Sequence, residues 1–66
     1  MYSIICRYQY WGPEGIAWTK WYIYKGNTEK AEGEEYLKTL IEGSTKDKLK
    51  QEYKLVANKE LKKFEL

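Results

Sequence analysis

The chain has 66 residues, one cysteine, no histidine and a formal net charge of +2. A domain of this length buries only about 60% of the surface that its unfolded chain exposes, so it often needs disulfides, a metal or oligomerisation for support. One cysteine excludes a disulfide within the monomer, and the lack of histidine argues against a zinc site. We therefore expect one small domain over residues 1–66, without a cofactor or metal, that gains support by oligomerisation.

The cysteine content and the N-terminal residues predict the cellular compartment. A single unpaired cysteine is typical of a reducing compartment. Residues 1–7 contain neither the apolar run nor the cleavage site of a signal peptide. No stretch approaches the roughly 18 apolar residues that a membrane span needs. These features favour a soluble cytoplasmic protein with no membrane partner.

A turn is expected at residues 12–15, between two segments rich in tyrosine, tryptophan and isoleucine. These segments, residues 2–11 and 16–25, carry side chains that favour the half-buried surface of a β-sheet. The intervening Gly-Pro-Glu-Gly combines a proline, whose fixed φ suits the second turn position, with a glycine that accepts a positive φ. The sequence therefore predicts a β-hairpin over residues 2–25.

Two loop lengths are open for this hairpin, and they give the sheet different faces. A three-residue loop with a glycine bulge would pair Gly12 with Ile16 and bring the even-numbered residues of both strands together. A two-residue loop would pair Gly12 with Gly15 and place even-numbered residues beside odd-numbered ones. Because a slip of one residue exchanges the faces of a strand, the sequence leaves the exposed face undecided.

A helix is predicted over residues 28–42, where the composition changes to mainly Glu, Lys, Ala, Leu and Tyr. Its apolar face consists of Gly33, Tyr36, Leu37, Leu40 and Ile41. A glycine on this face costs roughly 1 kcal/mol against alanine, which indicates a close approach to a bulky residue of the sheet. Gly43 is expected to end the helix.

Residues 51–57 fit a strand or a helix. We favour the strand, because a hairpin and a helix alone would leave a two-stranded sheet, which is marginally stable in water. The expected fold class is therefore α+β: a three-stranded antiparallel sheet in ββαβ order with one helix packed on one face. The tail over residues 60–66 could form a short fourth strand, a helical turn or no regular structure.

The order strand, strand, helix, strand over residues 2–57 resembles that of small ββαβ proteins encoded by phages and mobile elements. The run Trp-Thr-Lys-Trp-Tyr at residues 18–22 adds to this resemblance. The resemblance implies an accessory role, such as inhibition of a host complex, and it includes no catalytic motif.

The aromatic content exceeds what a small core needs. Three tryptophans and seven tyrosines are present, whereas one helix covers only one face of the sheet. We therefore expect an exposed face that combines aromatic and basic side chains, a composition enriched at interaction sites. The candidate binding residues are Arg7, Trp11, Trp18, Lys20, Trp21 and Tyr22.

These patterns favour a non-enzymatic protein-binding module whose partner is a second copy or a foreign protein. Cys6 has no histidine to activate it and is expected to be a buried apolar side chain, so enzyme activity is disfavoured. The alternative is a single-stranded nucleic-acid-binding protein that uses the aromatic and basic face. The charge gives this alternative less weight, because the sequence pI near 8.6 is below that of a typical nucleic-acid-binding domain. A third possibility is that the aromatic rings fill the core.

Overall fold

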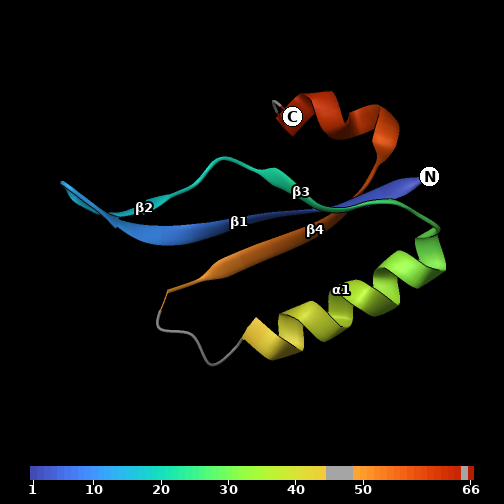
Figure 1. The fold of residues 1–66 in the computed structure, drawn as a ribbon, viewed down its shortest axis with the longest axis horizontal. Coiled ribbons are helices and arrows are strands. Elements are labelled where there is room, and N and C mark those ends of the chain that lie inside the picture. Colours follow the sequence, from blue (N-terminus) through green and yellow to red (C-terminus); the bar gives the residue numbers. More distant parts are fainter. Residues whose placement is uncertain (45–48, 65) are drawn as a thin grey trace.

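The computed structural model describes residues 1–44, 49–64 and 66, and it has the predicted α+β architecture. The elements in chain order are β1 (Tyr2–Gly12), β2 (Gly15–Trp18), β3 (Tyr22–Thr28), α1 (Lys30–Ser44), β4 (Gln51–Ala57) and the 3₁₀-helix η1 (Asn58–Phe64) (Figure 1). The predicted strand over residues 51–57 is confirmed as β4. The predicted second strand of the hairpin is divided into β2 and β3.

Strand β1 is the centre of an antiparallel sheet. Both β2 and β3 pair with β1, and β4 also pairs with β1. The backbone N–H and C=O groups of Tyr8 both bond to Thr19, whereas the next residue, Gln9, donates its N–H to Lys50. Because neighbouring residues of a strand direct these groups to opposite edges, β2 and β3 follow one edge of β1 and β4 lies on the other.

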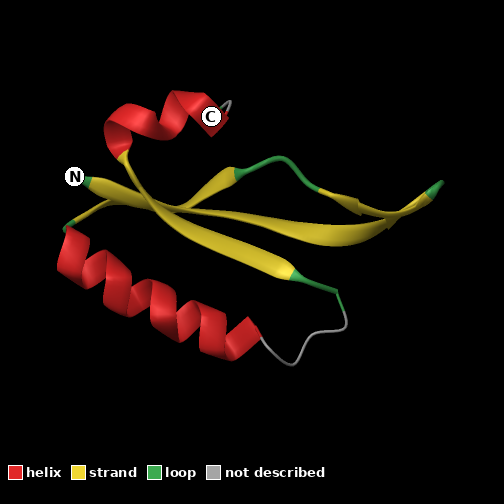
Figure 2. Ribbon diagram, turned by 180° about the vertical axis from the view of Figure 1, so that it is seen from behind, coloured by secondary structure: helices red, strands yellow, loops and turns green. Residues whose placement is uncertain are grey.

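The first half of β1 is covered on both faces. Ile4 and Ile5 are completely buried, although neighbouring side chains of a strand point to opposite faces. Helix α1 lies on one side of the sheet and η1 on the other (Figures 1 and 2). Residues 60–64 of the tail therefore lie in a helical turn, one of the three predicted states, and residue 65 lies outside the described residues. Helix η1 covers a face that the single predicted helix could not reach.

Gly33 determines how closely α1 approaches the sheet. A Cβ atom at this position would lie 2.6 Å from Cδ1 of Leu55 and 3.0 Å from Cγ2 of Thr28. This confirms the predicted close approach to a bulky sheet residue. Since Leu55 pairs with Ile4, α1 covers the face of β1 that carries its even-numbered side chains.

The observed helix is displaced by two residues from the predicted range of 28–42. Thr28 belongs to β3, where it pairs with Tyr2 and is buried, so it does not start the helix. The carbonyl group of Glu29 instead accepts the first helical bond, from the N–H of Gly33. At the other end α1 continues through Gly43 to residue 44, and the expectation that this glycine ends the helix is wrong.

The start of η1 is anchored by polar contacts to the sheet. The Ser3 hydroxyl donates to Oδ1 of Asn58 at 2.6 Å, and Nδ2 of Asn58 donates to Oδ1 of Asn27 at 2.8 Å. Asn27 has a positive φ of 54°, a conformation that asparagine tolerates better than most residues. These bonds join β1, β3 and η1. No helix in the described part of the chain is long and apolar enough to cross a membrane.

Candidate interaction surfaces of the hairpin

The turn of the hairpin is the two-residue loop. Gly12 pairs with Gly15, which leaves residues 13–14 between the paired positions. Gly15 has a φ of 120°, which other residues rarely adopt. The alternative that pairs Gly12 with Ile16 is therefore wrong at the turn.

The register set by this turn changes further along the hairpin. Trp18 pairs with Gln9 and Tyr22 pairs with Cys6, so residues 19–21 face only two residues of β1. One extra residue on one strand makes an irregularity of the β-bulge type. The even-with-odd pairing at the turn therefore becomes even-with-even at Tyr22.

Thr19 maintains hydrogen bonding across this irregularity. Its N–H donates to the carbonyl oxygen of Tyr8 at 2.9 Å, and its hydroxyl oxygen accepts from the N–H of Tyr8 at 3.1 Å. Trp18 and Trp21 are three residues apart and would face opposite sides of a regular strand. Because of the extra residue, both tryptophans instead lie against Arg7.

The guanidinium group of Arg7 is held by two indole rings and one carboxylate. Its Cζ lies 4.4 Å from the ring centroid of Trp18 and 4.7 Å from that of Trp21. Its Nη2 donates to Oε1 of Glu52 at 2.9 Å. Cation–π contacts contribute about 0.5–2 kcal/mol each, so Arg7 is an ordered part of the fold. Its buried Nε has no hydrogen-bond partner among the described residues.

The aromatic residue of η1 completes this cluster. The ring of Phe64 meets that of Trp21 edge to face, with centroids 5.8 Å apart. Nζ of Lys54 lies 5.4 Å from the Trp21 centroid and 5.9 Å from the Phe64 centroid. We call Arg7, Trp18, Trp21, Glu52 and Phe64 the Arg7 cluster.

A shallow depression of about 310 Å³ lies beside the Arg7 cluster. Its lining residues are Arg7, Thr19, Lys20, Trp21, Lys63 and Phe64. They come from β1, from the segment between β2 and β3, and from η1. The depression therefore exists only because η1 packs beside the irregular segment between β2 and β3.

Tyr22 lies on the opposite face of the sheet. It pairs with Cys6, and its ring meets that of Tyr8 edge to face at 6.3 Å. Hydrogen bonding with Cys6, burial, and the nearby ionisable groups of Cys6, Tyr53 and Tyr8 raise the pKa of Tyr22 to about 12. Cys6 itself is buried, as expected. Tyr22 is therefore separate from the other predicted binding residues.

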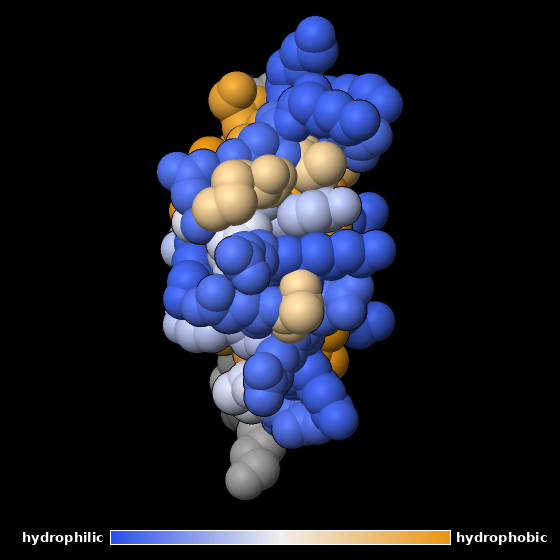
Figure 3. All heavy atoms as spheres, turned by 90° about the vertical axis from the view of Figure 1, so that its right-hand side faces the viewer, coloured by the Kyte–Doolittle hydropathy of each residue, from blue (hydrophilic) through white to orange (hydrophobic). Residues whose placement is uncertain are grey.

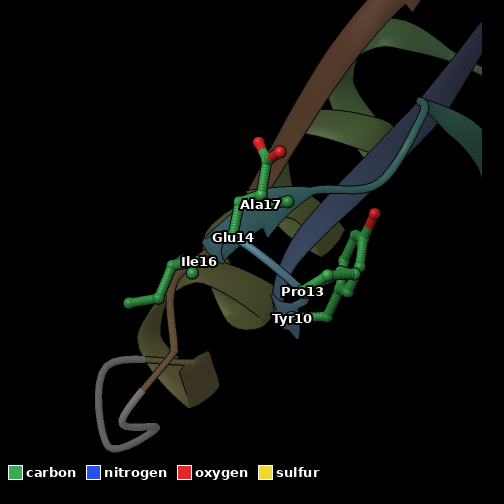
Figure 4. Close-up of a pocket in the computed structure, with 7 residues that line it drawn as sticks. Tyr10, Pro13, Glu14, Ile16 and Ala17 are labelled. Carbon is green, nitrogen blue, oxygen red and sulfur yellow. The ribbon is translucent and has the colours of Figure 1, made fainter.

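Trp11 lies near the turn, beyond the packed part of the sheet. Its partner across the hairpin is Ile16, and these side chains are 73% and 51% exposed. On the other face Tyr10, which is 44% exposed, pairs with Ala17. Tyr10 and Ile16 extend to opposite sides, around a depression of about 380 Å³ at the turn (Figure 4). Both faces are therefore accessible here.

The structure divides the predicted binding surface into three parts. It brings Arg7, Trp18, Lys20 and Trp21 together, and it places Trp11 on the projecting turn and Tyr22 on the α1 side. Sequence reasoning missed the two contributions of η1, Phe64 and Lys63. Their lining of the depression depends on the conformation of a tail for which the sequence left three states open.

Comparisons of the chain with protein families, curated proteins and solved structures find no match. Within the described residues, no three side chains of His, Cys, Asp or Glu lie together as a metal site would need. The function of this chain is therefore inferred from its own surfaces.

Proposed function

We propose that the protein is a non-enzymatic protein-binding module whose contact surface is the far end of the hairpin. This end, which we call the hairpin arm, consists of Gln9–Gly12 of β1, the turn and β2. It extends from the packed part of the sheet as the narrow end of the molecule (Figure 1). The observation that carries the proposal is the exposure of Trp11, together with that of Ile16 opposite it.

The residue types of the hairpin arm suit a protein contact. Tryptophan and tyrosine dominate binding hot spots because they bury a large area with little loss of side-chain entropy. The two-residue turn and the pairing with β1 hold these side chains on regular strands, which lowers the cost of ordering them. At the opposite end of the molecule, hydrophilic residues predominate and apolar residues form only small separate patches (Figure 3).

The partner that we propose first is a second copy of the chain. Among the described residues, the buried apolar side chains are Ile4, Ile5 and Cys6, which is a small core for a chain of 66 residues. Burial of Trp11 and Ile16 between two copies would add apolar area that the monomer leaves in water. At roughly 25 cal/mol per Å², such burial is the main stabilising contribution available to a domain of this size.

Sedimentation velocity over a series of protein concentrations tests this proposal. We expect reversible self-association of the wild type, weakened by Trp11→Ser combined with Ile16→Ser. Loss of a hot spot costs about 2 kcal/mol, which corresponds to roughly 30-fold in the dissociation constant. Ile23→Ser is the matched control, because Ile23 has a similar exposure of 48% but lies in β3, outside the hairpin arm. A wild type that stays monomeric at every concentration would exclude self-association.

A further inference from the structure

Three cationic side chains converge on the depression beside the Arg7 cluster. Arg7 comes from β1, Lys20 from the segment between β2 and β3, and Lys63 from η1. Among the described residues, Arg7 is paired with Glu52 at 2.9 Å, Lys63 approaches Glu60 only at 3.9 Å, and Lys20 forms no ion pair. The depression is therefore a region of positive electrostatic potential, which attracts anions.

Arg7 is the fixed element of this depression. Two indole rings and Glu52 hold its guanidinium group, so little side-chain entropy would be lost on binding a ligand. Its buried Nε–H still lacks a hydrogen-bond acceptor among the described residues. The Arg7 side chain is 30% exposed, and an oxyanion in the depression would approach this exposed part rather than the buried Nε.

The positive charge extends beyond the depression itself. Lys54 of β4 lies near the Trp21 ring. Lys59 and Lys62 belong to η1, which lies on the same side of the sheet. These lysines continue the positive charge. The opposite side carries α1, whose described side chains include four glutamates and two lysines. Since η1 and α1 lie on opposite sides of the sheet (Figure 2), the described part of the molecule has a basic η1 side and an acidic α1 side.

From this geometry we infer that the depression binds phosphate groups of a single-stranded nucleic acid, with the lysines of η1 following its backbone. The rings of Trp21 and Phe64 border the cations, and aromatic side chains beside a basic groove are what single-stranded nucleic acids contact. A shallow surface admits an extended chain, whereas a small free anion would need a more enclosed site. No residue that lines the depression belongs to the hairpin arm, although Trp18 of β2 contacts Arg7. The inference does not depend on the function proposed for the hairpin arm.

The experiment measures binding of a fluorescently labelled oligothymidylate by anisotropy over a series of salt concentrations. In the wild type we expect binding that weakens steeply with salt, because each neutralised phosphate releases counterions. The variant Lys20→Gln/Lys63→Gln should bind more weakly. The slope of log K against log salt should also become shallower by about 0.7 for each phosphate that the variant no longer neutralises.

The matched control is Lys30→Gln/Lys38→Gln, which removes the same charge from exposed positions of α1 on the other side of the sheet. This control should retain most of the affinity and the slope of the wild type. An equal loss in both variants would overturn the inference, because only net charge would then matter. Circular dichroism of both variants checks that the fold is unchanged, as expected for substitutions of exposed lysines.

Competing ligands distinguish the source of the anion. Equal binding of a polyglutamate of the same length would overturn the inference in favour of an acidic peptide, and equal binding of a duplex would overturn its single-strand part. Displacement by inorganic phosphate, at concentrations that leave the ionic strength unchanged, would indicate a small-anion site and also overturn it. The variant Trp11→Ser/Ile16→Ser should bind the oligonucleotide like the wild type, so failure of one proposal leaves the other intact.

Discussion

The two ends of the hairpin both carry large apolar side chains, but these side chains have opposite environments. In its first half, β1 has four consecutive buried residues, Ser3–Cys6, between α1, η1 and the strands on both edges. In its second half, Tyr10 and Trp11 are exposed on opposite faces, where neither helix covers the strand. We call the first region the packed half, to contrast it with the hairpin arm. Burial in this small protein therefore depends on which segments cover a strand, since even Trp11 and Ile16 stay exposed where no helix covers them.

The comparison is tested most strongly by the same substitution in both regions. Ile5→Ala, in the packed half, should lower the free energy of unfolding by about 2–5 kcal/mol, because it leaves a cavity in a completely buried site. A chain of this length has a total stability on the order of 3–10 kcal/mol, so this variant should be close to unfolding. Ile16→Ala, in the hairpin arm, should change the same quantity by no more than about 0.5 kcal/mol.

Urea denaturation followed by tryptophan fluorescence measures both variants. Protein concentrations low enough for the wild type to be monomeric separate folding from self-association. Equal destabilisation by the two substitutions would contradict the contrast, since it would mean that the hairpin arm also contributes to a folded core.

The packed half should also reject added atoms. Gly33→Val should destabilise the protein by about 1–3 kcal/mol, because its side chain would overlap Leu55 and Thr28. Gly43→Ala is the control in the same helix: among the described residues, apart from its chain neighbours and the backbone of its own helix, no atom lies within 4 Å of the added Cβ. It should stabilise the protein by up to about 1 kcal/mol through helix propensity. Thermal unfolding measures the two shifts, and a stabilising Gly33→Val would show that α1 lies further from the sheet.

Local patterns were sufficient for much of the fold. The Gly-Pro-Glu-Gly turn, the strand over residues 51–57 and the contact of Gly33 with a sheet residue each follow from short-range rules on φ, alternation and helical spacing. The start of α1 did not, because Thr28 is a good N-cap residue by type, yet its pairing with Tyr2 keeps it in the sheet. Tertiary pairing here overrides a local preference.

The candidate sites were less predictable, because they depend on a register change. Thr19, Lys20 and Trp21 have nothing in their sequence that marks a break, and regular alternation would separate Trp18 from Trp21. Their common contact with Arg7 requires the extra residue between β2 and β3 and the packing of Phe64 on Trp21. Both are long-range features that a single sequence does not encode as a local pattern.

The smallest expected effect is a pH dependence that only the packed half should show. The folded state raises the pKa of Tyr22 from 10.0 to about 12, through hydrogen bonding with Cys6, burial, and the nearby ionisable groups of Cys6, Tyr53 and Tyr8. The folded protein therefore holds this proton more tightly than the unfolded chain does. The associated stabilisation is complete below pH 10 and is lost as the pH rises toward 12. It should be small, because the side chain is partly exposed and solvent screens its interactions.

Tyr22→Phe should therefore reduce the fall in unfolding free energy across this pH range, and it should remove the phenolate absorbance change that Tyr22 contributes near pH 12. Tyr10→Phe, a matched change in the hairpin arm, should leave the contribution of Tyr22 in place. If the two variants titrate alike, Tyr22 does not lie in the environment that its pairing with Cys6 defines. The sheet faces assigned to the residues around the register change would then be wrong. These faces depend on the pairing of Tyr22 with Cys6, which places Tyr22 on the α1 side and leaves Trp18 and Trp21 against Arg7.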